Sequence, residues 1–289
     1  MKVAIASGKG GTGKTTVATN LAHLACGHGL SVAYVDCDVE EPNGHIFLKP
    51  EIESTEPVGN LVPQVDAERC THCGECGRVC QYNAITCVGE KVLVFPELCH
   101  GCGGCTRICP SGAITESMRE MGLLEQGRRG AMTFIHGRLN VGEVMSPPII
   151  RAVREACPAV DLAILDAPPG TSCPVIESIR GCDFIVLVTE PTPFGLNDLK
   201  LAVEMVRTLQ MPFGVVINRS DVGDRQVHEY CADEGIEILA EIPNDRGLAE
   251  AYSRGELAAE VSPALRERFE ELLAVVREKT GGDPAGGKV

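Results

Sequence analysis

The segment GKGGTGKTT, Gly8–Thr16, directly follows the apolar run KVAIAS, Lys2–Ser7, and the two together decide the fold of this chain. The apolar run predicts a short buried strand. The spacing Gly8-x4-Gly13-Lys14-Thr15 matches the phosphate-binding loop that leads from such a strand into a helix. In such a loop, backbone N–H groups and the helix N-terminus cradle phosphates. A glycine turn that binds nothing is the alternative, and the strand, loop and helix in register argue against it.

The loop residues have expected roles that follow from this motif. Lys14 is expected to reach the β- and γ-phosphates of a nucleotide, and Thr15 is expected to ligate Mg²⁺. The sequence therefore predicts a site for a nucleotide and Mg²⁺, with contacts from Gly8, Gly10, Gly11, Thr12, Gly13, Lys14, Thr15 and Thr16.

Apolar runs typical of buried strands alternate with helical stretches along most of the remaining chain. The runs are residues 31–38, 161–167, 183–190, 213–218 and 236–242, and the helical stretches are residues 148–156, 197–209, 225–234 and 262–279. This alternation predicts an α/β fold with a mostly parallel, doubly wound sheet covered on both faces. A return hairpin is expected over residues 118–139.

Eight cysteines form two runs of nearly identical spacing in the middle of the chain. The runs are Cys70-x2-Cys73-x2-Cys76-x3-Cys80 and Cys99-x2-Cys102-x2-Cys105-x3-Cys109-Pro110. Each matches the bacterial ferredoxin spacing, in which three thiolates hold one [4Fe–4S] cluster and the fourth reaches the neighbouring cluster. The predicted ligand sets are Cys70, Cys73, Cys76 and Cys109 for cluster 1, and Cys99, Cys102, Cys105 and Cys80 for cluster 2. A zinc site or a disulfide frame is the alternative, but zinc gives no reason for a duplicated run that ends in Cys-Pro.

The cysteine runs interrupt the strand–helix alternation, which predicts a discontinuous nucleotide-binding domain. Residues 1–61 and 117–280 are expected to form that domain, and residues 62–116 are expected to form an inserted small α+β ferredoxin domain. Residues 281–289 are expected to be a flexible tail.

The composition of the chain argues against several classes of function and location. The net charge of −14, with no cluster of Lys and Arg, argues against a nucleic-acid-binding surface. No run of 18 apolar residues occurs, and the first strand begins at Lys2, so neither a membrane span nor a signal peptide is expected. Eight of the 15 cysteines are assigned to clusters and the others are scattered, which indicates a reducing cytoplasm.

With Lys9 included, the loop reads KGGTGKT and resembles the deviant P-loop of the MinD/Mrp ATPases and the nitrogenase iron protein. The resemblance implies that the chain binds and hydrolyses ATP. It also implies that Lys9 crosses a dimer interface to the nucleotide of the partner. A solvated lysine at the start of a loop is the alternative for Lys9.

The resemblance extends along nearly all of the chain outside the cysteine runs. Asp36 and Asp38 stand where the family carries its first switch, which implies that Asp38 orients the attacking water and that Asp36 assists Mg²⁺ through water. Asp166, in the segment DAPPGT, resembles the second-switch aspartate that holds Mg²⁺ through water. A helix cap is the alternative for such an aspartate. The predicted catalytic residues are Lys9, Lys14, Asp38 and Asp166.

The segment after the run at 213–218 is similar to the element of the family that contacts the base. The resemblance implies that the amide of Asn218 faces adenine and that the segment Pro243–Asp245 closes the other side, with contacts from Pro243 and Asp245. An asparagine that only forms a turn after a strand is the alternative for Asn218.

Taken together, the chain resembles a MinD-superfamily ATPase with an inserted two-[4Fe–4S] ferredoxin domain. It departs from two branches of that superfamily. The Cys-Pro-x-Cys pair of Mrp-type cluster carriers is missing, and the two nitrogenase-type cysteines that share one cluster across a dimer have no counterpart.

Three functions are consistent with these features. The first is ATP-gated electron transfer through the two clusters to a redox or metallocluster protein, and the second is ATP-dependent assembly or delivery of Fe–S or mixed-metal clusters. The third is spatial partitioning of the MinD kind with redox-sensing clusters. The balanced charges of the stretch 262–279 disfavour it, because they indicate docking on the sheet rather than on lipid. The expected assembly is a homodimer, or a heterodimer with a paralogue, across ATP.

Overall fold

The computed structural model describes residues 1–281 of the chain and divides it into two compact units. The sheet unit comprises Met1–Thr55, Leu124–Arg138 and the described residues from Ile150 onward. The cysteine unit comprises Glu56–Leu123 and Leu139–Ile149. The tail expected at residues 281–289 lies, from residue 282 onward, outside the described residues.

A nine-stranded sheet in the order β11-β10-β9-β1-β8-β2-β7-β6-β3 forms the framework. The neighbouring pairs from β11 to β7 are all parallel. The bounds of these seven strands are β1 Lys2–Ala6, β2 Val32–Asp36, β7 Met132–Leu139, β8 Leu162–Asp166, β9 Phe184–Thr189, β10 Phe213–Asn218 and β11 Ile238–Ile242. This arrangement confirms the α/β fold with a large, mostly parallel sheet.

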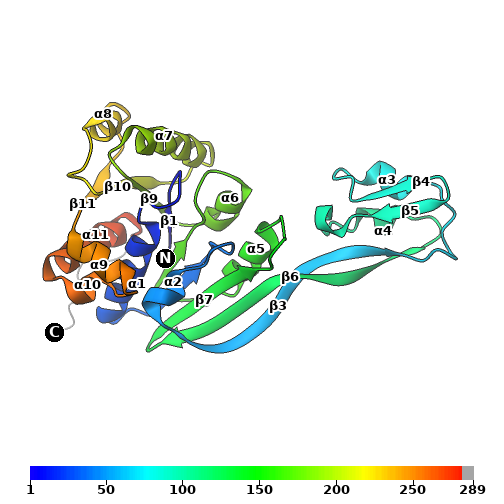
Figure 1. Cartoon of the computed structure of the whole chain (residues 1–289), viewed down its shortest axis with the longest axis horizontal. Coiled ribbons are helices and arrows are strands. Elements are labelled where there is room, and N and C mark those ends of the chain that lie inside the picture. The colour runs from blue at the N-terminus through cyan, green and yellow to red at the C-terminus, as the bar shows by residue number, and fades with distance from the viewer. Residues whose placement is uncertain (282–289) are drawn as a thin grey trace. The chain divides into compact units, whose positions relative to one another are not determined.

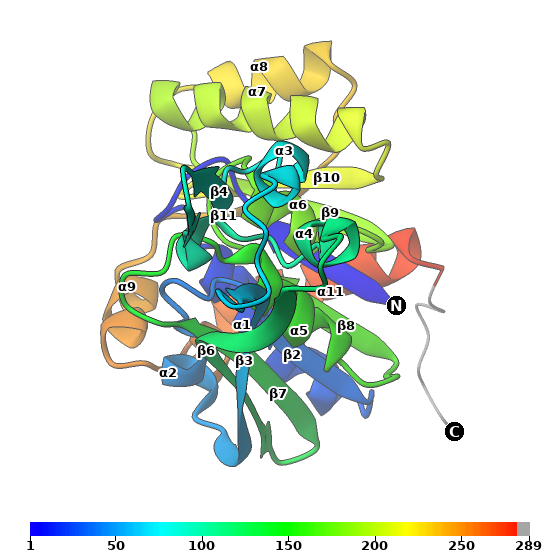
Figure 2. The ribbon, with the colours of Figure 1, turned by 90° about the vertical axis from the view of Figure 1, so that its right-hand side faces the viewer.

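Helices cover both faces of the parallel part of this sheet (Figure 1). On one face, α1 (Lys14–Gly27) and α11 (Pro263–Lys279) pack together, and their apolar side chains join a core with β1, β2 and β8. On the other face, α6 (Cys173–Ile179) packs on β1 and β8, and α7 (Pro193–Thr208) packs on β9 beside α8 (Gln226–Asp233) (Figure 2). The remaining helices are α2 Gly44–Leu48, α5 Pro147–Glu155, α9 Arg246–Ser253 and α10 Ala258–Val261.

The helix α11 docks on the sheet, as its charge balance predicts. Its apolar stripe is buried, with Leu265, Phe269, Leu272 and Val276 between 0% and 2% exposed. Ser262 caps the helix by accepting a hydrogen bond from the Leu265 N–H at 3.4 Å, and Pro263 occupies the first turn.

The start of α7 differs from the sequence-based expectation, which placed it at Asn197. The helix begins at Pro193, because Thr192 accepts a hydrogen bond from the Gly195 N–H at 3.0 Å and acts as N-cap. The segment Thr192–Gly195 is therefore the first turn of a helix rather than a loop.

The hairpin expected over residues 118–139 is longer than predicted. Its strands are β6, Ile114–Arg129, and β7, and they turn at Gly130, whose φ of 58° suits glycine. The edge strand β3, Glu51–Val65, has no counterpart among the predicted strands. Its sequence, EIESTEPVGNLVPQV, carries prolines and no sustained apolar alternation, so no local signal marks it.

The cysteine unit is built from a duplicated pattern. A two-stranded antiparallel sheet pairs β4 (Ile85–Val88) with β5 (Lys91–Val94), and two short helices, α3 (Glu75–Val79) and α4 (Gly104–Ile108), pack against each other. Each short helix lies within one cysteine run. The small core of the unit gathers cysteines of both runs around Ile85 and Ile114.

Candidate functional site

The loop between β1 and α1 has the shape of an anion cradle. Gly11 and Gly13 take positive φ values of 79° and 96°, which is the conformation that favours glycine. A side chain at Gly13 would also collide with the amide nitrogen of Asn218. Lys14 opens α1 and is 7% exposed, so its ammonium group lies inside the fold at the helix N-terminus.

A cavity of about 380 Å³ lies against this loop. Its volume falls within the range of about 300–1,000 Å³ that is usual for small-molecule sites. Most of the residues predicted to contact nucleotide line it, namely Gly10, Gly11, Gly13, Lys14, Thr15, Thr16, Asp38, Asn218, Pro243 and Asp245. Four other predicted residues do not line it: Thr12, Asp36 and Asp166 are buried, and a side chain at Gly8 would collide with the backbone of Asp198.

The two strand-end aspartates meet at one edge of the sheet. Asp36 on β2 and Asp166 on β8 are register partners and are 0% and 1% exposed. Asp166 accepts a hydrogen bond from the Tyr34 hydroxyl at 2.9 Å, and Asp36 accepts from the backbone N–H groups of Asp38 and Gly44 at 3.1 and 3.0 Å. The role of Tyr34 escapes sequence reasoning, because it stands inside an apolar strand.

This pair of acids fits a divalent cation. The Oδ1 atom of Asp166 is buried without a hydrogen-bond partner, and the side chain of Thr15 lies beside the same carboxylate. Burial, together with the proximity of the two carboxylates, raises the pKa of Asp36 well above its usual value, and burial likewise raises the pKa of Asp166. Oxygen ligands of this kind suit Mg²⁺, which would neutralise both acids.

Asp38 lies at the cavity wall with a perturbed acidity. Burial raises its pKa from 3.8 to about 6, against the opposing effect of the Lys14 ammonium. A carboxylate that is ionised only above this pH and faces a phosphate cradle is suited to orienting water.

The elements expected to bind adenine make specific contacts within the chain. Asn218 donates one Nδ2 hydrogen to the Thr12 carbonyl at 2.8 Å, so this amide group holds the phosphate loop, and its oxygen and its second N–H hydrogen are left for a base. Asp245 caps α9 by accepting from the Leu248 N–H at 2.8 Å. Its prediction as an adenine contact therefore rests on its place in the cavity lining alone.

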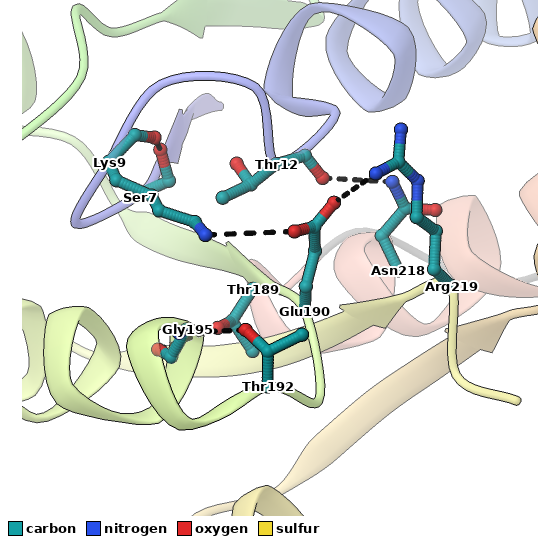
Figure 3. A network of polar contacts seen from close by, with 9 residues as sticks. All are labelled: Ser7, Lys9, Thr12, Thr189, Glu190, Thr192, Gly195, Asn218 and Arg219. Atoms are coloured by element: carbon teal, nitrogen blue, oxygen red, sulfur yellow. Dashed lines mark hydrogen bonds and ion pairs between the residues drawn. The ribbon is translucent and has the colours of Figure 1, made fainter. Parts of the chain in front are cut away.

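Lys9 does not line the cavity. Its ammonium lies 3.7 Å from Oε2 of Glu190, and Arg219 lies 2.9 Å from Oε1 of the same carboxylate (Figure 3). Glu190 and Arg219 follow β9 and β10, and sequence reasoning assigned no individual role to either of them. The sequence feature that could have indicated them is their position directly after β9 and β10, since both strands end at the same edge of the sheet as β1, which leads into the phosphate loop.

The cysteine unit contains two further cavities, each lined by four cysteines. Cys70, Cys73, Cys76 and Cys109 line one, and Cys80, Cys99, Cys102 and Cys105 line the other. The fourth cysteine of each run therefore faces the three cysteines of the other run. Within residues 1–281, no three Cys, His, Asp or Glu side chains gather closely enough to hold a single metal ion.

The two runs also share their hydrogen-bond pattern. Cys80 accepts from the Ala84 N–H and Cys109 accepts from the Ala113 N–H, both at 3.3 Å. Although burial opposes it, hydrogen bonds from Ser111 and Ala113 lower the pKa of Cys109. N–H donors to sulfur favour the thiolate, which is the form that binds iron. Four thiolates around a cavity fit a [4Fe–4S] cluster.

Comparison with known proteins identifies the fold family. Residues 3–258 match the CobQ/CobB/MinD/ParA nucleotide binding domain family. The chain belongs to this family. It is accordingly a P-loop ATPase, and the loop at Gly8–Thr16 has the spacing of the phosphate-binding motif. None of the helices in the described residues is both long and apolar enough to cross a membrane.

Individual relatives align over nearly the whole chain. An uncharacterized protein of Methanocaldococcus jannaschii is 32% identical over 281 residues, which cover 96% of this chain and 97% of that protein. An iron–sulfur cluster carrier protein of the same organism is 25% identical over 97% of this chain and 85% of its own length. The solved structure of the septum site-determining protein MinD with Mg-ADP from Pyrococcus horikoshii has a TM-score of 0.62 at 19% identity, and the match covers 100% of this chain and 99% of that one. This structural likeness establishes the fold alone.

The first prediction concerns Lys14. Replacing it with alanine removes a charge-assisted contact to phosphate, so the affinity for ATP should fall about 10- to 100-fold. Isothermal titration with a non-hydrolysable ATP analogue measures this change. Lys200→Ala is the matched control, since Lys200 lies over the Tyr230 ring away from the cavity, and its affinity should equal that of the wild type. Equal affinity in Lys14→Ala would contradict the assigned role.

The second prediction concerns Asp38. We expect Asp38→Asn to bind ATP but to hydrolyse it at least about 100-fold more slowly, because the carboxylate that positions water is gone. In the wild type, kcat/KM should fall as the pH drops through about 6, where Asp38 becomes protonated. The pH profile of ATP hydrolysis by both proteins measures this, and the variant should lack that acid limb.

The stability of the nucleotide-free protein supplies an independent check on Asp38. Its folded-state pKa of about 6 exceeds the usual 3.8, so the ionised carboxylate destabilises the fold at neutral pH, and this cost disappears as the pH falls through the window between the two values. Asp38→Asn should therefore raise the free energy of unfolding at pH 7.5 by about 1–3 kcal/mol and leave it nearly unchanged at pH 4. A loss of stability at pH 7.5 would contradict the assigned burial cost.

Proposed function

We propose that this ATPase carries two [4Fe–4S] clusters in its cysteine unit and works in the assembly or delivery of iron–sulfur clusters. One observation carries the proposal: a single chain of the MinD/ParA family holds a cavity against its P-loop motif and two cavities that are each lined by four cysteines. The inserted ferredoxin domain that we propose corresponds to residues 62–116, which lie within the cysteine unit.

At the nucleotide site, we assign one role to each of five side chains. Lys14 binds the β- and γ-phosphates, Thr15 ligates Mg²⁺, and Asp166 holds the ion through water from the buried edge of the sheet. Asp38 orients the attacking water. Lys9 acts on the nucleotide of a second protomer, so that two chains enclose ATP between them.

In the cysteine unit, the proposal rests on the chemistry of the eight thiols as iron ligands. Cys70, Cys73, Cys76 and Cys109 would hold cluster 1, and the other four cysteines would hold cluster 2. A bound [4Fe–4S] cluster supplies one-electron redox chemistry at a potential set by its surroundings. The residues of the chain provide the thiolates and the N–H donors that stabilise them.

The assembly or delivery role is supported by relatives. Iron–sulfur cluster carrier proteins from Methanocaldococcus jannaschii and Pyrococcus horikoshii, each 25% identical to this chain, align with 97% and 99% of it. The missing Cys-Pro-x-Cys pair means that a delivered cluster would have to be held by other thiols.

Electron transfer is the second candidate, and the cysteine cavities favour it. Each cavity presents a full set of four thiols, so each cluster would be held at every iron and would stay with the protein. In this role, ATP binding would gate electron flow from the clusters to a redox or metallocluster protein.

The third prediction is the metal content. Anaerobically purified protein should contain about eight iron and eight acid-labile sulfide per chain, because two cubane clusters require them. Cys109→Ala should lose about half of the iron, since it removes one ligand of cluster 1. Metal analysis and the visible charge-transfer absorption measure both quantities.

Cys87 offers a matched control for this experiment. It lies in the same unit, and its thiol contacts the carbonyls of His72 and Gly89 at 3.6 and 3.5 Å, outside both sets of four. Cys87→Ala should keep the full iron content. Stoichiometric zinc in place of iron after anaerobic reconstitution would contradict the proposal, and unchanged ATP affinity in each variant shows that the sheet unit remains folded.

The fourth prediction separates the two candidate roles. Protein loaded with ⁵⁷Fe is incubated anaerobically with an excess of an apo [4Fe–4S] protein, with and without Mg-ATP. Assembly or delivery predicts that label moves to the acceptor and that ATP changes the rate. Electron transfer predicts that the label stays, while a non-hydrolysable ATP analogue changes the EPR line shape or the potential of at least one reduced cluster relative to ADP.

Asp38→Asn and Lys14→Ala serve as controls for nucleotide coupling. Asp38→Asn should show the same response to the ATP analogue as the wild type, because it still binds nucleotide, whereas Lys14→Ala should lose it. If the label stays in place and the spectra are identical in the apo, ADP and analogue states, both candidate roles are wrong.

A further inference from the structure

Glu190 holds two cations that belong to different elements. Its carboxylate is 11% exposed, and it lies 3.7 Å from the ammonium of Lys9 through Oε2 and 2.9 Å from the guanidinium of Arg219 through Oε1 (Figure 3). Lys9 begins the phosphate loop, and Arg219 directly follows β10. The carboxylate thus joins the nucleotide loop to the edge of the sheet.

The position of Glu190 is fixed by its own segment. Its carbonyl accepts a hydrogen bond from the Thr192 N–H at 2.8 Å, which closes the turn before α7. Thr189 and Thr192 both bond to Gly195, and a side chain at Gly195 would collide with the Glu190 carbonyl. The backbone that carries Glu190 is therefore held in place at the start of α7.

The two cations lie at unequal distances from the carboxylate. Arg219 contacts Glu190 at 2.9 Å and Lys9 contacts it at 3.7 Å, and their side chains are 55% and 32% exposed, respectively. A nearly buried carboxylate is costly without a counter-ion. Because Arg219 remains as that counter-ion, Lys9 can move away and the Glu190 carboxylate still has a cation beside it.

We propose that Glu190 is a positioning residue that holds Lys9 in an intramolecular ion pair until a second protomer binds. The inference rests on the proposed function, in which Lys9 acts on the nucleotide of the partner. Lys9 cannot occupy both positions, so association must break its contact with Glu190. Glu190 then lowers the population of the association-competent protomer, and Arg219 raises it by competing with Lys9 for the same carboxylate.

The fifth prediction tests the ion pair itself in the nucleotide-free monomer. Acetylation of Lys9 by acetic anhydride, followed by mass spectrometry, should proceed about two- to fivefold faster in Glu190→Gln, because the contact that protects the ammonium is gone. Arg219→Gln should slow it, since Lys9 becomes the sole counter-ion. Exposed Lys91 serves as the internal standard in every protein.

Nucleotide-dependent association tests the consequence. By sedimentation velocity, Glu190→Gln should form dimers at about two- to fivefold lower concentrations of a non-hydrolysable ATP analogue than the wild type, and Arg219→Gln at higher ones. Arg219 also lines the nucleotide cavity, so its variant has a second route to weaker association. In Glu190→Gln/Arg219→Gln, the effect of Arg219→Gln on Lys9 acetylation should vanish, because both cations act through one carboxylate.

Glu234→Gln is the matched control, because it removes a carboxylate that pairs with Arg207 on the surface, and it should change neither readout. Equal Lys9 acetylation in wild type and Glu190→Gln would overturn the inference, and so would weaker association of Glu190→Gln. Failure of every protein to dimerise with the analogue would instead refute the proposed nucleotide sandwich and, with it, the role of Glu190 in association. The acetylation result would then report on the ion pair alone.

Discussion

The parallel pairing of β2 with β8 is the constraint on which the nucleotide site depends. It places Asp36 beside Asp166, while β1 aligns Ile5 with Asp166 and delivers the phosphate loop to the same edge. Carboxyl ends of parallel strands gather functional side chains in this way, because the chain must leave the sheet at each of them. The cost is two carboxylates buried together. Tyr34 and the backbone N–H groups around Asp36 offset that cost in part, and a divalent cation would offset the rest.

Local sequence patterns predicted the strands and helices that are marked by residues within the element itself. The strands β1 and β10 follow from uninterrupted apolar runs, and Ser262 with Pro263 marks the start of α11. The edge strand β3 could not be predicted, because its pairing is supplied by β6, distant in the sequence. The start of α7 was placed too late, although Thr192 followed by Pro193 is a start signal of the same kind as Ser262 followed by Pro263.

In the candidate sites, too, local spacing predicts some features, and others depend on contacts between segments that are distant in the sequence. The grouping of the cysteines follows from spacing alone, because the short helix in each run fixes where its fourth cysteine faces. The partner of Lys9 does not follow from spacing, since Lys9 and Glu190 are separated by most of the chain and meet only because β1 pairs with β9. The contact between Asn218 and the Thr12 carbonyl is hidden for the same reason. Both contacts link the loop to the ends of neighbouring strands.

At the nucleotide site and in the cysteine cavities, burial acts on the acidic groups in the same direction. Burial raises the pKa of Asp36 and Asp166 at the nucleotide edge, and it raises the pKa of Cys76 and Cys105, the third cysteines of the two runs. These four groups are held closer to their protonated forms, whereas hydrogen bonds shift Cys109 toward its thiolate. Binding of Mg²⁺ or of iron must therefore displace protons, so the affinity at both sites should fall with decreasing pH. In a chain of net charge −14, bound metal supplies the positive charge that these anionic sites lack.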